Sequence, residues 1–235
     1  MPREATTEVP APDATPDAVL AERLHAWVRE ADFPCLGARA ALAHGDLHTL
    51  VARDLDSAWD DLPIHAALKR FVTDYRAAPG PFRSLAVIFH GPDSLDEPAF
   101  EAALWRRLQS LSDKDAFAGE PYDPKVSSDP ADPHFSLSFG GEAFFVVGLH
   151  PGASRPARRF AHPAIVFNPH DQFERLRADG RYGRLRETIL GRDVALAGSA
   201  NPMLADFGEA SEARQYSGRA VGDDWRCPFH PKPRT

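Results

Sequence analysis

The sequence predicts a single α+β domain whose mixed or antiparallel sheet is flanked by helices. Stretches with apolar side chains at helical spacing are interleaved with short apolar runs that are typical of strands. Two of these runs, 135–139 and 143–149, are separated by a Gly-Gly pair, the pattern of a β-hairpin. Because a hairpin is antiparallel, it favours α+β over a doubly wound fold. No linker-like segment divides the 235 residues, which indicates one domain.

The first residues differ in composition from the rest of the chain. Residues 1–16 are rich in Pro, Ala, Thr and acids and show no apolar period. Such a segment cannot bury enough apolar surface to fold, so we expect a disordered N-terminal tail. The domain itself is then expected over 17–235.

Two helices are predicted at the start of the domain. Apolar residues at helical spacing predict the first over 17–30. Asp32 as a cap and Pro34 in the first turn predict a second helix that continues to Gly45. Cys35 would then lie at a helix N-terminus, where we expect a lowered thiol pKa. The other predicted elements are strands over 47–53, 84–90 and 164–167 and helices over 64–75, 100–111, 172–176 and 182–190.

Composition and motifs exclude several classes of protein. A net charge of -7 disfavours a nucleic-acid partner, which needs clustered positive charge. No apolar run approaches the roughly 20 residues of a membrane span and no signal pattern is present, so we expect a cytoplasmic protein without a membrane partner. Two cysteines do not indicate a disulfide framework. Phosphate loops, GxSxG, HExxH and CxxC are missing, which disfavours standard hydrolases and nucleotide enzymes.

Two histidines follow predicted strands of the second half. His150 comes directly after the strand 143–149, and His170 comes shortly after the strand 164–167. Two imidazoles at the ends of neighbouring strands are expected to converge on one face of the sheet, as in a metal or cofactor pocket. The alternative is that each histidine is a hydrogen-bonded structural residue.

Basic residues are concentrated after His150. Between His150 and Arg192 there are nine arginines and four acids, so this stretch carries 9 − 4 = +5. Arg155, Arg158 and Arg159 are the first of them, and their guanidinium forks suit the propionates of a cofactor or the carboxylate of a substrate. The alternative is that the arginines form the solvated faces of two helices.

Two further segments carry polar or nucleophilic residues. Asp206, Glu209 and Glu212 are spaced three residues apart in a polar segment and suit a guanidinium or amine substrate, with a solvated surface loop as the alternative. Cys227 precedes a proline, and a cysteine thiolate is a known type of haem ligand. The alternative for Cys227 is a buried, inert thiol.

Four blocks of the sequence resemble the YqcI/YcgG family. They are FPCLGARAAL (33–42), GGEAFFVVGLHPGASRPARRFAHPAIVFNPHDQFERLR (140–177), NPMLADFGEASEARQYSG (201–218) and WRCPFH (225–230). Members of this family with an assigned activity are haem-dependent enzymes that N-hydroxylate guanidino compounds such as arginine. The resemblance therefore implies an enzyme with haem b and an arginine-like, cationic substrate.

With this resemblance we expect a haem-dependent monooxygenase that takes electrons from a donor or uses peroxide. The haem would carry the chemistry, while the protein supplies the axial ligand and orients the substrate. His150 is the expected iron ligand, with Cys227 and His170 as alternatives. His170, Glu209 and Glu212 are the expected catalytic residues.

Two other functions remain open at this point. One is a non-haem iron oxygenase in which His150, His170 and a carboxylate such as Glu174 or Glu142 bind the metal. The other is a protein that binds or senses haem or a small anion without turnover. Neither the oligomeric state nor the pathway follows from the sequence.

Overall fold

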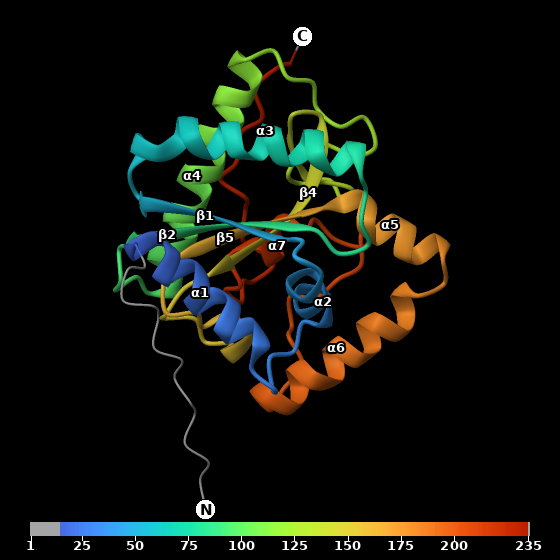
Figure 1. Ribbon diagram of the computed structural model, residues 1–235. Coiled ribbons are helices and arrows are strands. Elements are labelled where there is room, and N and C mark those ends of the chain that lie inside the picture. Colours follow the sequence, from blue (N-terminus) through green and yellow to red (C-terminus); the bar gives the residue numbers. More distant parts are fainter. Residues whose placement is uncertain (1–14, 235) are drawn as a thin grey trace, which may run out of the picture.

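The protein folds around one five-stranded mixed sheet with strand order β1-β2-β5-β4-β3 (Figure 1). The structure is a computed structural model and describes residues 15–234. β1 and β2 pair in parallel, whereas β2–β5, β5–β4 and β4–β3 pair antiparallel, which confirms the predicted α+β class. The strands are β1 Leu47–Asp54, β2 Ser84–Gly91, β3 Leu137–Phe139, β4 Glu142–Leu149 and β5 Ala164–Pro169.

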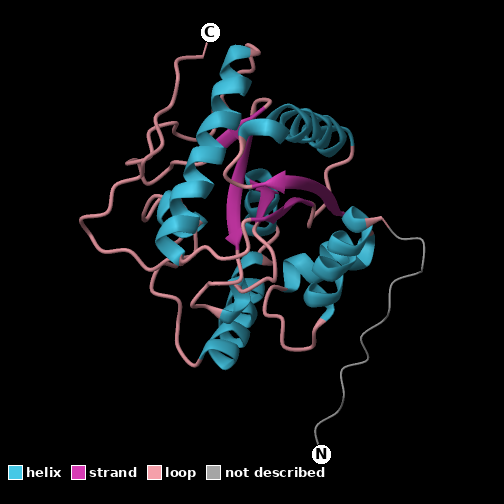
Figure 2. Cartoon of the chain, turned by 90° about the vertical axis from the view of Figure 1, so that its left-hand side faces the viewer, coloured by secondary structure: helices cyan, strands magenta, loops and turns pink. Residues whose placement is uncertain are grey.

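Helices cover both faces of this sheet (Figures 1 and 2). α1 and α2 pack on one face, and α3, α4 and α7 contribute to the core on the other. None of the helices within residues 15–234 is long and apolar enough to cross a membrane. The helices are α1 Pro16–Arg29, α2 Leu36–His44, α3 Asp61–Ala77, α4 Glu97–Phe117, α5 His170–Ala178, α6 Tyr182–Ala197 and α7 Ala213–Tyr216, with short 3-10 turns at Ala58–Asp60 and Pro156–Arg158.

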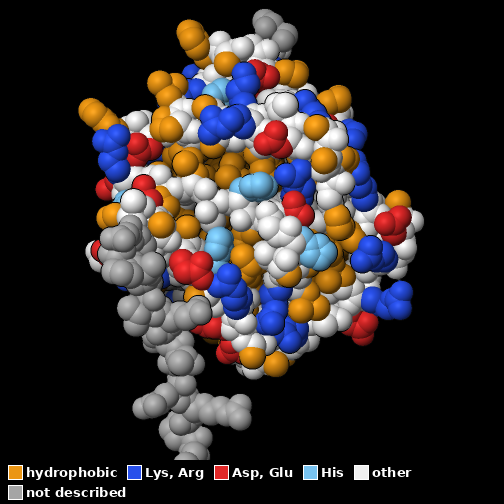
Figure 3. Space-filling model, in the orientation of Figure 1, with side chains coloured by type: hydrophobic (Ala, Val, Ile, Leu, Met, Phe, Trp, Pro, Cys, Tyr) orange, Lys and Arg blue, Asp and Glu red, His pale blue; other side chains and the backbone are white. Residues whose placement is uncertain are grey.

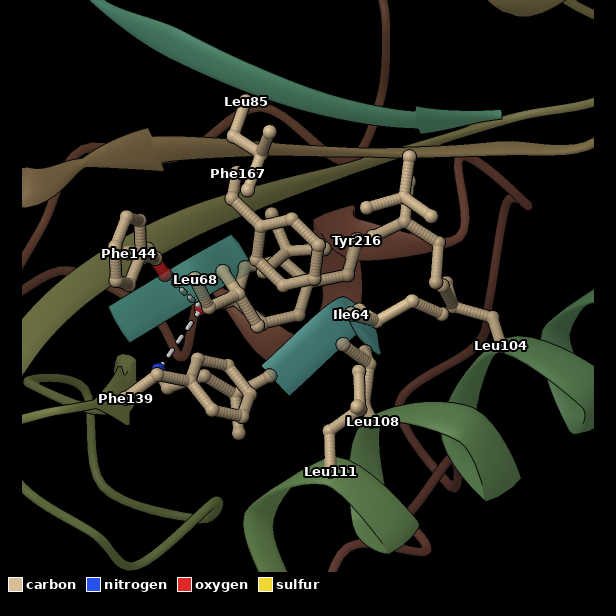
Figure 4. Packing of buried hydrophobic residues seen from close by; sticks show 14 of the residues in the cluster. Ile64, Leu68, Leu85, Leu104, Leu108, Leu111, Phe139, Phe144, Phe167 and Tyr216 are labelled. Atoms are coloured by element: carbon tan, nitrogen blue, oxygen red, sulfur yellow. Dashed lines mark hydrogen bonds between the residues drawn. The ribbon is translucent and has the colours of Figure 1, made fainter. Parts of the chain in front are cut away.

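The larger core lies between the sheet and the α3–α4 pair. Leucines of α4 and apolar residues of α3 pack against phenylalanines of β4 and β5, with Tyr216 of α7 among them (Figure 4). The smaller core joins α1 and α2 to the opposite face. Apolar residues recur every 3.6 residues in the helices and every 2 residues in the strands. Each helix therefore has an apolar stripe and each strand an apolar face, and these pack against one another in the two cores.

The predicted hairpin is present, and its turn explains the Gly-Gly pair. Gly140 and Gly141 both adopt positive φ, 58° and 77°. Paired residues with positive φ are the requirement of a tight hairpin turn, and glycine adopts this conformation without strain. The turn is held to α4, because the buried carboxylate of Asp115 accepts the Gly140 N–H at 3.1 Å.

The start of α2 differs from the prediction. α2 begins at Leu36 with Cys35 as its N-cap, so Asp32 is not the cap and Pro34 precedes the helix. The Cys35 sulfur accepts the Ala38 N–H at 3.5 Å. Burial raises the pKa of the Cys35 thiol, so the predicted activation is wrong: desolvation outweighs the helix N-terminus.

The N-terminal boundary lies slightly earlier than predicted. Thr15 caps α1 and Pro16 is its first residue, so these two residues belong to the domain. The rest of the predicted tail, residues 1–14, lies outside the described residues. α7 was not predicted, because four residues are too few to show a helical period.

Candidate functional site

His150 and His170 lie at opposite ends of the β4–β5 pair. Leu149 pairs with Ala164 and Phe144 pairs with Pro169. The two histidines are therefore separated by at least five residue steps, or roughly 16 Å. The predicted convergence is wrong, because ends of successive strands meet at one edge only when the strands are parallel.

His150 occupies a buried position without hydrogen-bond partners. Only 1% of the residue is exposed, and its ring stacks on Phe100 of α4 with centroids 4.1 Å apart. Neither ring nitrogen makes a hydrogen bond of normal geometry within residues 15–234, although the Leu95 carbonyl lies close enough to affect the pKa of the ring. Burial lowers the pKa of His150, and this effect outweighs the nearby Leu95 carbonyl, which raises it. The ring is therefore neutral at pH 7.

Two glycines allow this packing around His150. A Cβ on Gly152 would lie 2.5 Å from the Leu95 carbonyl oxygen, and one on Gly148 would lie 2.8 Å from the Phe100 ring. Both distances are shorter than any normal contact, so only glycine lets the chain approach α4 here. The glycines of the GLHPG segment thus place His150 against the start of α4.

Arg158 ties the end of β4 to α7. Its guanidinium donates to the carbonyls of Gly148 at 3.0 Å, Tyr216 at 3.2 Å and Gln215 at 3.0 Å. No ion pair of Arg158 occurs within residues 15–234, and burial lowers the pKa of its guanidinium to about 10. Arg158 therefore has a structural role at this position, and the charge of Asp193, which pairs with Arg155, also acts on it.

The other two predicted arginines differ in what they contact. Arg155 forms an ion pair with Asp193 of α6 at 2.5 Å, so its charge is already neutralised. Arg159 donates to the carbonyls of Ala153 and Ser154, both at 2.8 Å. It also borders a hollow of about 380 Å³ that begins at the residue after His150, and this hollow is lined by Arg23, Ala26, Trp27, Glu30, Pro151, Arg159, Phe160 and Ala161.

His170 and Glu212 form a second buried polar cluster. His170 is the first residue of α5, and its Nε2 lies 3.5 Å from Oε1 of Glu212. Both side chains are 7% exposed. The other oxygen of Glu212 accepts from the Ser136 hydroxyl at 3.0 Å and lies 3.3 Å from the Tyr216 hydroxyl. Two predicted catalytic residues, distant in sequence, therefore share one buried cluster.

Tyr216 extends between the two clusters. Its backbone carbonyl accepts from Arg158, next to the His150 end of β4. Its hydroxyl lies 3.2 Å from the Phe144 carbonyl, at the His170 end (Figure 4). Burial raises the pKa of Tyr216 and the charge of Glu212 raises it further, so the phenol is protonated. One residue of α7 thus connects both ends of β4.

A model of the YqcI/YcgG family matches residues 24–230. The chain belongs to the YqcI/YcgG family. The matched range contains both buried clusters, from β4 through α7. No curated protein and no solved structure matches the chain.

In this YqcI/YcgG protein, Asp206 and Glu209 do not lie with Glu212, the third acid predicted to bind the substrate. Asp206 pairs with Arg186 at 3.0 Å and lies 3.3 Å from the Tyr182 hydroxyl. Glu209 accepts the Asp206 N–H at 3.0 Å and so closes a local turn. The structure thus separates the three predicted substrate-binding acids: only Glu212 faces the interior.

The remaining predicted ligands are also dispersed. Cys227 packs half-buried against the larger core, and burial raises its pKa to about 12. Glu142 pairs with Arg76 at the far end of β4, and Glu174 pairs with Arg177 on α5. Within residues 15–234, no three His, Cys, Asp or Glu side chains are arranged to hold a metal ion.

Other arginines between His150 and Arg192 lie on solvated helix faces, which was the alternative to a binding role. Basic and acidic side chains are interspersed on the face of the domain that Figure 3 shows. Arg175 pairs with Asp171 and Arg177 with Glu174 within α5. These side chains form solvated helix faces, as charge runs of this kind usually do.

Sequence reasoning missed the residues that complete each cluster. Phe100 lies far from His150 in sequence, and no local pattern connects them. Tyr216 could have been found, since Glu212 and Tyr216 are four residues apart and such residues share one helix face.

Proposed function

We propose that the protein is a haem-dependent oxygenase that N-hydroxylates a guanidino or amino small molecule, with His150 as the axial ligand of haem b. The observation that carries this proposal is the buried, neutral imidazole of His150 with two unpartnered ring nitrogens. A buried polar group without a partner destabilises a fold by about 1–3 kcal/mol, so native proteins rarely keep one. Neutral imidazole is also the form that binds metal ions.

The arrangement of donors favours haem over a non-haem iron centre. A haem needs a single axial ligand from the protein, which one histidine supplies. A non-haem oxygenase centre needs two histidines and a carboxylate around one ion. His170 follows β5 at the other end of β4, and within residues 15–234 no three His, Cys, Asp or Glu side chains are arranged to hold a metal ion. The donor chemistry of His150 therefore fits haem.

A hollow beside Pro151 gives room for a flat ligand next to the His150 segment, while the His150 ring itself packs against Phe100 and is not part of the lining. Trp27 and Phe160 lie with ring centroids 5.4 Å apart and give the hollow aromatic walls, and Arg23 and Arg159 border it. Aromatic walls suit a flat macrocycle, and arginines suit its propionates. Of the three arginines predicted for this role, Arg159 is the one we propose to bind a propionate.

Haem, when bound, would supply the activation of oxygen or peroxide. The chain would hold the iron through a ring nitrogen of His150. We assign His170 and Glu212 a positioning role, because their buried contact lies at the opposite end of β4 from His150 and links α5 to α7. Tyr216 positions this pair, because its hydroxyl contacts Glu212 and its backbone is fixed by Arg158.

An absorption spectrum tests the cofactor. Protein produced with a haem precursor should show a Soret band, and His150→Ala should abolish or greatly shift it. His170→Ala is the matched control and should retain the band, because it lies at the other end of β4. An unchanged spectrum for His150→Ala would reject His150 as the ligand, and a ferrous-CO band typical of thiolate ligation would assign Cys227 instead.

Product analysis separates an oxygenase from a haem-binding protein. The haem-loaded protein is incubated with arginine-like substrates and either a reductant or peroxide. A hydroxylated product supports the proposed reaction. Haem retention without any product over a panel of guanidines and amines would favour the sensing alternative.

A further inference from the structure

A second hollow lies at the far end of β4 from His150. Its volume is about 350 Å³, and it is formed by the end of α3, the start of α5, the β3–β4 turn and the loop around residue 124. Glu142, the first residue of β4, lines it, whereas His150 follows the last residue. The two positions are eight residue steps or roughly 26 Å apart, so this hollow is distinct from the proposed haem centre.

Buried acids line the hollow and exposed bases surround it. The side chains of Glu142 and Asp171 are 11% and 20% exposed, and Asp123 is buried. The cationic side chains are far more open, at 51% for Arg76 and 69% for Lys125. The hollow thus has an acidic floor and a basic rim.

The acids of the floor differ in how fully they are bonded. Asp123 accepts the N–H groups of Lys125 and Ala143, so both of its oxygens are used. Glu142 accepts from Arg76 through Oε2, and within residues 15–234 its Oε1 accepts no hydrogen bond. Burial raises the pKa of Glu142, and the charges of Asp123 and Asp171 raise it further. Arg76 already lowers this pKa through its pair with Oε2, and a second cation next to Oε1 would lower it further.

We propose that this hollow binds a small zwitterion that carries a primary ammonium group and a carboxylate on a short chain. The ammonium group would lie on the floor between Glu142 and Asp171. The carboxylate would lie at the rim and accept from Arg76, the arginine that now pairs with Glu142. A volume of about 350 Å³ is within the range of small-molecule pockets.

Binding would exchange ion pairs rather than leave charges unpaired. Arg76 now pairs with Glu142 at 3.0 Å and Arg175 with Asp171 at 2.7 Å. Both arginines are half-exposed, so water can solvate a released guanidinium; Arg76 would also give up its bond to the Gly141 carbonyl at 2.7 Å. The ligand's ammonium group would replace one arginine at its acid, and the released arginine would bind the ligand's carboxylate. The number of ion pairs does not fall.

A calorimetric titration of the full chain tests this proposal with ε-aminocaproate as the zwitterion. Butylamine supplies the cation alone and hexanoate the anion alone. We expect saturable binding of ε-aminocaproate at least about tenfold tighter than either single-charge probe, because it makes a charge-assisted contact at each end. Glu142→Gln should weaken this binding by about tenfold or more.

Matched variants locate the effect. Glu174→Gln removes an acid of α5 that lies outside the hollow, and its affinity should equal that of the wild type. His150→Ala should also bind ε-aminocaproate normally, which separates this site from the haem proposal. Arg76→Gln changes an exposed residue and should bind butylamine as before while losing the preference for the zwitterion.

Three results would overturn the proposal. They are a lack of saturable ε-aminocaproate binding, equally tight butylamine binding by the wild type, and an unchanged affinity in a folded Glu142→Gln protein. If Glu142→Gln does not fold, Arg76→Gln decides: an unchanged preference for the zwitterion rejects the site.

Discussion

Gly152 lies in the turn after His150, and glycine is required there because the backbone approaches Leu95 closely. Its hypothetical Cβ meets a backbone carbonyl, that of Leu95, which cannot rotate away as a side chain can. The start of α4 would have to move, and with it Phe100, on which the His150 ring stacks. Glycine at this position therefore controls the environment of the proposed iron ligand.

Gly152→Ala should lower the free energy of unfolding by about 1–3 kcal/mol, the usual cost of overpacking. Gly191→Ala is the matched control: it lies in α6, and a Cβ there meets nothing within 4 Å. The control should leave stability unchanged or raise it by up to about 1 kcal/mol, because alanine favours helix. Urea unfolding measures both. Equal stability of the two variants would contradict the packing described for His150.

Burial also makes the reactivity of Cys227 predictable. Its pKa is raised from 9.0 to about 12, and only the thiolate is nucleophilic. At pH 8 the thiolate fraction in the folded protein should therefore be about a thousandfold below that of the unfolded chain. Iodoacetamide labelling followed by peptide mass spectrometry, with and without urea, measures the ratio. Fast labelling of folded Cys227 would restore it as a candidate thiolate ligand.

At the scale of elements, α7 and β4 organise both polar clusters. The sequence predicts β4, β5 and the hairpin turn because alternation and Gly-Gly are local signals. It does not predict that His150 and His170 are separated, because that depends on the direction in which β5 pairs with β4. The contact between His170 and Glu212 likewise depends on α7, which is too short to show a period.

Tyr216→Phe should lower the free energy of unfolding by about 1–2 kcal/mol. The variant removes a buried hydroxyl that lies 3.4 Å from the Leu137 N–H and 3.2 Å from the Phe144 carbonyl, and so leaves buried groups unsatisfied. Tyr182→Phe is the control, since its hydroxyl contacts Asp206 in a half-buried position. Its effect should stay within about 0.5 kcal/mol. Equal effects in chemical denaturation would show that α7 is not held by this hydroxyl.

At the scale of the whole molecule, the C-terminal segment from Phe229 to Arg234 packs against the α3–α4 side of the domain. Phe229 enters the larger core, and the backbone of His230 exchanges hydrogen bonds with the Gln109 amide. Arg234 reaches the fully buried carboxylate of Asp115, which also binds His65 of α3 at 2.7 Å. None of this follows from local sequence, because Arg234 and Asp115 are 119 residues apart.

Arg234→Ala should therefore destabilise the whole domain rather than only release its last residues. The variant leaves the Asp115 carboxylate buried without its guanidinium, and breaking a buried ion pair typically costs about 3–5 kcal/mol. Lys232→Ala is the matched control two residues away. Lys232 is 57% exposed and pairs with Asp113, so its loss should cost less than about 1 kcal/mol. Urea unfolding gives the difference, and hydrogen exchange shows whether α3, α4 and the hairpin turn lose protection together. We expect a joint loss because Asp115 contacts all three elements. If exchange increases only after Trp225 and the free energy of unfolding is unchanged, the C-terminal segment does not stabilise the domain.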